Sequence, residues 1–257
     1  IASISKVFTA TLLSHLLVDS TISMDEPIEN FLPFKLNTSN YDNSEVTLKT
    51  LLNHTSGFPR MPSDYIEIIE NNKNDNVYDS RKLEEYLQDK LILTHKPGEE
   101  YLYSNLGYTT IGFLIEQIQK TQYEDLLQQK VCSEYGMNNT TTDYNKIKKY
   151  IVIGRDSLGQ SLPFEDLGIY KFSGGVFSTV SDLSKFILAN FSDDKILNYQ
   201  RQETYRWGNA DMALGWQISN FGGANCKWYF HNGSLDGYRS ACFMDVSSKC
   251  AVTILSK

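Results

Sequence analysis

The chain has 257 residues, of which 41% are hydrophobic and 21% are charged. Its 16 glycines and 6 prolines are too few for a collagen-like or linker-dominated chain, so we expect a compact globular protein of one large domain or two small ones. The 24 basic and 31 acidic residues give a net charge of −7, which argues against nucleic acid as a partner.

The most apolar stretch near the start covers residues 7–18. It is interrupted by polar residues and is shorter than the roughly 18 residues that a membrane-spanning helix needs, so no membrane span is expected. It also lacks the basic leader and the cleavage site of a signal peptide. The four cysteines show no C-x-x-C spacing, and the histidines form no metal signature, so no metal or cofactor is expected.

Hydrophobic periodicity predicts a chain that is helical first and sheet-bearing last. Helices are predicted at residues 3–18, 24–31, 48–52, 81–91, 107–120, 123–131 and 181–190. Residues 58–80 are polar, and the Asn/Asp cluster at 71–76 is typical of a solvated loop. Antiparallel strands are predicted at 227–231, 238–244 and 251–255, separated by turns at Asn232-Gly233 and 245–249.

Ser3 and Lys6 form an S-x-x-K motif at the start of the first predicted helix. Positions i and i+3 share one face of a helix, so we expect the lysine amine beside the serine hydroxyl. A serine hydroxyl becomes a good nucleophile when a neighbouring base takes its proton, and a buried lysine can be that base. The motif alone arises by chance about once in a chain of this length, and its structural reading is a capping serine and a surface lysine.

A second pattern, Tyr103-Ser104-Asn105, lies between a Pro-Gly turn and an apolar helix. Its phenol is suited to proton transfer, and its amide is suited to holding a substrate carbonyl. The same Y-x-N pattern occurs at Tyr41 in a polar loop, so the pattern by itself is weak. Taken alone, Tyr103 is equally well explained as a packed tyrosine with a satisfied hydroxyl.

A third pattern, His231-Asn232-Gly233-Ser234, ends a predicted strand. Glycine lets a ligand approach the backbone, and the next amide can point at an oxyanion. A single histidine before a turn is most often structural. However, a nucleophile, a phenol and an imidazole on separate elements are what an acyl-transfer site requires.

The order of these motifs resembles the class C β-lactamase and serine DD-peptidase family of penicillin-recognising serine hydrolases and related esterases. The resemblance spans essentially the whole chain. It rests on Ser3-x-x-Lys6, residues 51–57, Pro97-Gly98 with residues 103–108, residues 174–183 and His231-Asn232-Gly233. Five patterns in register are far more specific than any one of them.

The resemblance implies a role for each catalytic residue. Ser3 matches the acylated nucleophile and Lys6 its proton partner. Tyr103 matches the residue that moves a proton between the nucleophile, the leaving group and water. The backbone N–H groups of Ser3 and Ser234 fall where the family builds its oxyanion hole.

The resemblance also implies the substrate-binding residues. Asn105 matches the ligand of the substrate amide, and His231 and Gly233 match the strand that lines the site. His231 stands where typical class C β-lactamases have a lysine. This difference favours DD-peptidases, D-amino-acid peptidases and esterases over efficient β-lactamases.

The fold implied by the resemblance is α+β, of the β-lactamase/DD-peptidase type. A mostly helical region at about 1–170 is expected to pack against an antiparallel sheet with flanking helices at 171–257, with the site between them. The family has strands before its nucleophile and a closing helix after its last strand, so these 257 residues are expected to hold an incomplete sheet with exposed edges. The family is periplasmic or secreted; the segment itself leaves the location and the oligomeric state open.

The function implied by the resemblance is hydrolysis through a serine acyl-enzyme. The expected substrate is a small molecule or peptide: a D-alanyl peptide, a small ester or a β-lactam. The alternative is a non-catalytic or slowly turning-over penicillin-binding protein or sensor, against which the intact Ser3, Lys6, Tyr103 and Asn105 argue. His54 is expected in a structural corner, and Trp216 is expected to be a core or rim aromatic.

Overall fold

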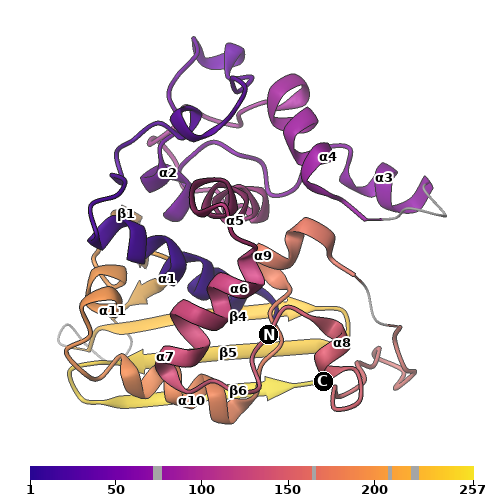
Figure 1. Ribbon diagram of the computed structural model, residues 1–257, viewed down its shortest axis with the longest axis vertical. Helices are drawn as coiled ribbons and strands as arrows, with labels where there is room; N and C mark the ends of the chain where they lie inside the picture. Colours follow the sequence, from indigo (N-terminus) through magenta and orange to yellow (C-terminus); the bar gives the residue numbers. More distant parts are fainter. Residues whose placement is uncertain (72–76, 164–165, 208–209, 221–225) are drawn as a thin grey trace.

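The structure is a computed structural model that describes residues 1–71, 77–163, 166–207, 210–220 and 226–257. Figure 1 shows an antiparallel sheet at one end of the molecule, a group of helices at the other end, and helix α1 between them. The described residues therefore form the α+β architecture that the sequence predicts. No helix among them is long and apolar enough to cross a membrane.

The sheet has six strands, each paired with its neighbours in sequence. They are β1 Tyr205–Trp207, β2 Ala210–Met212, β3 Gln217–Ser219, β4 Trp228–Leu235, β5 Tyr238–Asp245 and β6 Cys250–Ser256. The three long strands confirm the three that the sequence predicts. In the described part of the chain β6 has no strand partner other than β5, and its Val252 and Ile254 are 48% and 53% exposed.

The predicted turn at Asn232-Gly233 is wrong. Both residues lie inside β4, where Asn232 pairs with Ala241 and Gly233 with Ser240. The hairpin turns instead after Leu235, at residues 236–237, where Gly237 has a φ of +75°. An Asn-Gly pair is a strong hairpin signal, but here the glycine is needed for close packing within the strand.

All the helices of the described residues lie before the sheet in sequence. They are α1 Ser5–Val18, α2 Leu48–Leu52, α3 Tyr65–Asn71, α4 Ser80–Glu85, α5 Asn105–Gln119, α6 Tyr123–Leu127, α7 Ser133–Tyr135, α8 Tyr144–Ile147, α9 Lys171–Gly174, α10 Val180–Ala189 and α11 Lys195–Gln200. A 3-10 turn, η1 Ala2–Ile4, precedes α1. The polar stretch 58–80, for which the sequence predicts no helix, contains α3. Of the Asn/Asp cluster predicted as a solvated loop, Asn71 ends α3 and residues 72–76 lie outside the described residues.

Helix α1 is buried along almost its whole length; only His15 and Val18 are not fully buried. Its polar side chains are satisfied inside the protein. Thr11 Oγ1 donates to the carbonyl of Val7 at 2.9 Å, and Ser14 Oγ donates to that of Ala10 at 2.8 Å. Buried hydroxyl groups with such partners do not destabilise the core. The helix is therefore a fixed support for the residues at its start.

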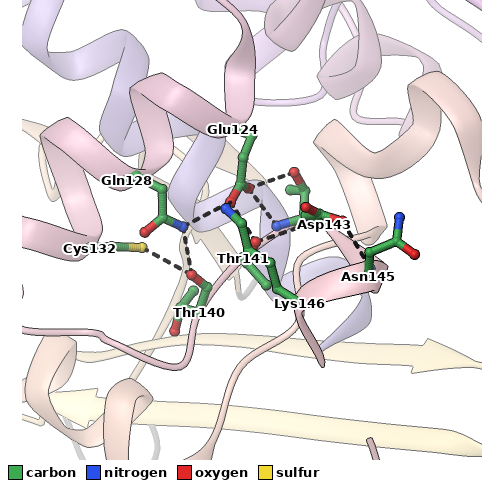
Figure 2. Close-up of polar contacts among 9 residues, drawn as sticks. Glu124, Gln128, Cys132, Thr140, Thr141, Asp143, Asn145 and Lys146 are labelled. Carbon is green, nitrogen blue, oxygen red and sulfur yellow. Dashed lines mark hydrogen bonds and ion pairs between the residues drawn. The ribbon is translucent and has the colours of Figure 1, made fainter. Parts of the chain in front are cut away.

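A polar network holds residues 140–146, which follow α7, against α6 (Figure 2). The carboxylate of Glu124 accepts hydrogen bonds from Thr141 Oγ1, from the backbone and hydroxyl of Thr142 at 2.6 and 2.7 Å, and from Lys146 Nζ at 3.1 Å. Burial raises the pKa of Glu124, but these hydrogen bonds outweigh it and hold the pKa below its usual value. Thr141 also pairs with Phe177 by two backbone hydrogen bonds, so the network anchors the chain that follows α9.

Candidate active site

Ser3 and Lys6 are neighbours at the start of α1. Ser3 lies in η1 and Lys6 in the first turn of α1. Lys6 Nζ is 3.1 Å from Ser3 Oγ, so the i, i+3 spacing brings the amine beside the hydroxyl as predicted. Ser3 is partly exposed, whereas Lys6 is fully buried. A substrate can therefore reach the hydroxyl while the amine is shielded from water.

Lys6 has two further partners. Its Nζ donates to Asn105 Oδ1 at 2.8 Å and to the backbone carbonyl of Ser173 at 2.7 Å. Burial, and to a smaller extent the charge of Arg60, hold the pKa of Lys6 well below its usual range. A neutral amine has two N–H groups and one lone pair. Because the Asn105 and Ser173 oxygens can only accept, they take the two N–H groups, and the lone pair is left for the Ser3 hydroxyl.

Tyr103 also reaches Ser3. Its hydroxyl is hydrogen bonded to the Ser3 side chain, and the centre of its ring lies 5.0 Å from Lys6 Nζ. Burial raises the pKa of Tyr103 to about 12, against a smaller lowering by the Ser3 hydrogen bond. The phenol is therefore protonated at neutral pH and can donate a proton.

His54 packs directly against Tyr103, with ring centres 4.5 Å apart. Its Nδ1 accepts a hydrogen bond from the backbone N–H of Ser104 at 3.1 Å, and its carbonyl accepts one from Leu102 at 2.8 Å. These two bonds hold the residues on both sides of Tyr103. Burial is the main reason that the pKa of His54 is well below its usual value, so the ring is neutral.

Asn105 is the first residue of α5, which is capped by the Ser104 hydroxyl bonded to the Gly107 N–H at 2.9 Å. Because its Oδ1 is held by Lys6, the orientation of the amide is fixed. Its Nδ2 donates to the sulfur of Met61 at 3.5 Å, and a thioether is a weak acceptor. The amide N–H₂ is thus suited to bind a stronger acceptor, such as a substrate carbonyl.

Strand β4 brings His231 to the same place. The centre of its ring is 6.2 Å from that of Tyr103. His231 Nδ1 is 2.7 Å from the carbonyl of Asn232, which can only accept, so the neutral ring carries its lone pair on Nε2. Burial, and to a smaller extent the charge of Lys6, lowers the pKa of His231 to about 3. The strand therefore presents a neutral imidazole.

Gly233 lets β4 touch the turn that carries Ser3. A Cβ atom at Gly233 would lie 2.5 Å from the carbonyl oxygen of Ile1 and 2.8 Å from the Cβ of Ala2. Any other residue would therefore push β4 away from η1. Among the described residues β3 pairs only with 228–230, so the edge of β4 opposite β5 has no strand partner at 231–235, where Ser234 lies. Such an edge can offer backbone N–H groups to a ligand.

The structure thus places five of the sequence-predicted residues close together, Ser3, Lys6, Tyr103, Asn105 and His231, with Gly233 packed against η1 and Ser234 farther along β4. It also adds two contributors that the sequence does not indicate, the Ser173 carbonyl and Arg60, and it packs the corner residue His54 against Tyr103. The weak Y-x-N match at Tyr41 lies elsewhere, with its hydroxyl bonded to the Thr94 carbonyl at 3.2 Å. Trp216 is 1% exposed and belongs to the core. Within the described ranges no three His, Cys, Asp or Glu side chains gather to hold a metal ion.

Comparisons with known proteins identify relatives over the whole length of the chain. The family model described as Beta-lactamase matches residues 1–257. The chain is 28% identical to Protein flp of Staphylococcus aureus (strain MW2), covering 100% of this chain and 52% of that protein. It is 26% identical to Beta-lactamase-like protein 2 of Dictyostelium discoideum, covering 93% and 46%. The chain therefore spans about half the length of these curated relatives.

Solved structures share the fold. The octameric penicillin-binding protein homologue from Pyrococcus abyssi is similar with a TM-score of 0.83 and 26% identity, covering 100% of this chain and 61% of that one. The Beta-Lactamase/D-Alanine Carboxypeptidase from Pseudomonas syringae has a TM-score of 0.84 and 20% identity, covering 100% and 78%. The fold is thus of the β-lactamase/DD-peptidase type, as predicted, and the chain belongs to the beta-lactamase family.

Proposed function

We propose that the chain is a serine hydrolase that acts through an acyl-enzyme on Ser3. The observation that supports this proposal most strongly is the state of Lys6. Its two N–H groups are taken by acceptors, its pKa is well below its usual range, and its Nζ is 3.1 Å from Ser3 Oγ. A neutral amine in this position can take the Ser3 proton as the oxygen attacks.

The proposed reaction has two steps. Ser3 Oγ attacks the substrate carbonyl as its proton passes to Lys6, and backbone N–H groups of Ser3 and Ser234 stabilise the oxyanion. Tyr103 then protonates the leaving atom, while Asn105 holds a carbonyl of the acyl part. In the second step water attacks the ester and gives its proton to Tyr103, which lost one to the leaving atom. Ser3 then leaves with the proton that Lys6 holds.

The proposed substrates are D-alanyl peptides and small esters, with β-lactams less favoured. A neutral His231 in place of a lysine supports this order, because the strand then adds no charge to the site. The Pseudomonas syringae protein of the same fold is named both as a β-lactamase and as a D-alanine carboxypeptidase, which agrees with these substrate classes. We propose nothing about the parts of the longer relatives that this chain does not match.

The nucleophile is tested by Ser3→Ala, with hydrolysis of a p-nitrophenyl ester as the readout. We expect turnover to be abolished, and we expect the control Ser39→Ala, an exposed serine bonded to Asn37, to match the wild type. An unchanged rate in Ser3→Ala would remove the nucleophile assignment. A panel of a D-Ala-D-Ala peptide, nitrocefin and short-chain esters then ranks the substrates.

A fluorophosphonate or fluorescent penicillin separates the enzyme from the alternative sensor. Labelling of Ser3 followed by turnover of substrates indicates a hydrolase. A stable label with no turnover indicates a penicillin-binding protein or sensor, and no label at all indicates a binder that lacks acyl chemistry.

A further inference from the structure

Arg60 lies at the entrance of the site. Its backbone carbonyl accepts hydrogen bonds from the N–H groups of Asn105 at 3.0 Å and Leu106 at 3.3 Å, so its position next to the start of α5 is fixed. The Arg60 side chain is exposed, and its Cζ lies 5.2 Å from the centre of the Tyr103 ring. The guanidinium therefore lies over the ring of Tyr103, a proposed catalytic residue.

The guanidinium has no hydrogen bond or ion pair with the residues that the structure describes; the Tyr103 ring is its contact. Other arginines of this acidic chain are paired. Arg206 contacts Glu203 at 2.8 Å, and Arg81 contacts Glu85 at 3.9 Å. An arginine side chain carries donors in a planar fork that matches a carboxylate. At Arg60 this fork is left open toward the solvent beside Tyr103.

Arg60 also differs in charge from the site residues near it. His231 is neutral because its pKa is lowered to about 3, and burial holds the pKa of Lys6 well below its usual range, whereas Arg60 carries a guanidinium. No carboxylate of the described chain contributes to the shifted pKa values of Lys6, His54, Tyr103 or His231. An uncompensated positive charge thus lies over the Tyr103 ring, among site residues whose pKa values no carboxylate perturbs, in a protein whose net charge is −7.

We propose that Arg60 binds a carboxylate of the substrate. This inference rests on the proposed function and narrows its substrate class to acyl donors with a carboxylate in the leaving half. Tyr103 is the group that protonates the leaving atom, so the leaving half lies against Tyr103 and within reach of the guanidinium on its ring. Arg60 is a specificity residue, and no bond forms or breaks on it.

Two matched esters test the proposal: 3-acetoxybenzoate and 3-acetoxybenzamide, which differ in the carboxylate. The readout is the ratio of their kcat/KM values, each corrected for the ester's own hydroxide-catalysed rate. The wild type is expected to prefer the benzoate. Arg60→Ala is expected to lower the ratio by about tenfold to a hundredfold, as for a lost charge-assisted hydrogen bond.

The controls separate recognition from structure. Arg60→Lys keeps the charge but not the fork, so its ratio is expected between those of the wild type and Arg60→Ala. Arg81→Ala removes an exposed arginine on α4 and is expected to leave both rates unchanged. An equal fall for both esters in Arg60→Ala, or an unchanged ratio, would overturn the proposal.

A failure of the proposed function gives a different result. Ser3-dependent hydrolysis of the neutral benzamide supports the function whatever Arg60 does. If neither ester is hydrolysed, ligand-observed NMR titration of N-acetyl-D-alanyl-D-alanine and its C-terminal amide decides the inference. We expect the acid to bind the wild type at least tenfold more tightly than the amide, and Arg60→Ala to lose this preference; equal binding to the wild type would contradict it.

Discussion

At the scale of single residues, the state of Lys6 depends on what surrounds it. A charged amine in a fully buried position would have to be paired with an acid, and no acid lies among the partners of its Nζ. The neutral form satisfies its two N–H groups and leaves one lone pair. The chemistry of the site therefore follows from burial together with the number of acceptors, rather than from an added charge.

The pH profile of kcat/KM tests this state. The lowered pKa of Lys6 predicts that activity reaches its plateau at a lower pH than an ordinary lysine would allow, and falls below that pH as Lys6 becomes protonated. The raised pKa of Tyr103, about 12, predicts no loss up to pH 10. We therefore expect a plateau between pH 8 and 10 in p-nitrophenyl acetate hydrolysis by stopped-flow, after subtraction of the rate of Ser3→Ala. A steady rise of about tenfold per pH unit up to pH 10 would mean that Lys6 has an ordinary pKa.

The residues of the site were predictable from sequence to different degrees. Ser3 and Lys6 are three positions apart, so local helix geometry predicts their contact. The bond from Lys6 to Asn105 joins residues 99 positions apart, and only the motif order indicated it. Arg60 lies in a polar loop without a recognisable pattern, because what makes it notable is the absence of a partner in space.

At the scale of elements, β4 and η1 pack directly against each other. Ser240 Oγ donates to the carbonyl of Ile1 at 2.6 Å, beside the place where Gly233 has no side chain. This contact sets the distance between the Ser3 hydroxyl and the strand. The geometry of acyl transfer tolerates little displacement, since a shift of about 1 Å can cost a hundredfold in rate.

Gly233→Ala tests this packing. The added Cβ would lie 2.4 Å from Ser240 Oγ and 2.5 Å from the Ile1 carbonyl, so β4 must move. We expect a loss of about 1–3 kcal/mol in the free energy of unfolding and at least a tenfold fall in kcat/KM. The control is Gly174→Ala, whose Cβ meets only Leu167 Cδ1 at 3.7 Å. Urea unfolding and ester hydrolysis measure both effects, and a Gly233→Ala variant with wild-type activity would contradict the argument.

Elements with strong local signals were predictable, and those made by tertiary contact were not. The helix predicted at 48–52 is α2, and Thr47 caps it with its side chain accepting from the Thr50 N–H. Helix α3 was missed because a helix of seven residues has little local stability of its own. Strands β1 to β3 were missed because each is three residues long, which is too short for a period of two to be recognised in the sequence. The Asn232-Gly233 pair shows a tertiary contact overriding a turn signal.

At the scale of the whole molecule, the site joins distant parts of the chain. Lys6 binds Ser173, 167 positions away, and Ser240 binds Ile1, 239 positions away. The proposed regions 1–170 and 171–257 therefore both contribute to one set of hydrogen bonds. Neither region can hold the site in place alone.

Urea unfolding tests whether the two regions behave as one unit. We expect fluorophosphonate labelling of Ser3 and the far-UV circular dichroism signal to be lost at the same urea concentration, since the site requires both regions. Ser3→Ala provides the unlabelled background. Labelling lost well before the circular dichroism signal would indicate that the sheet region separates from the helices first.

The burial of α1 has a consequence for directed evolution. Nearly every position of the helix faces the interior, and its hydroxyl groups already have partners. Most random substitutions in α1 therefore destabilise the fold, so a library of such variants contains few folded proteins with a changed substrate selectivity. Diversity is better introduced at exposed positions at the rim of the site, such as Arg60 beside Tyr103 and Asn232 next to His231. A library restricted to that rim should retain most of its members as folded enzymes.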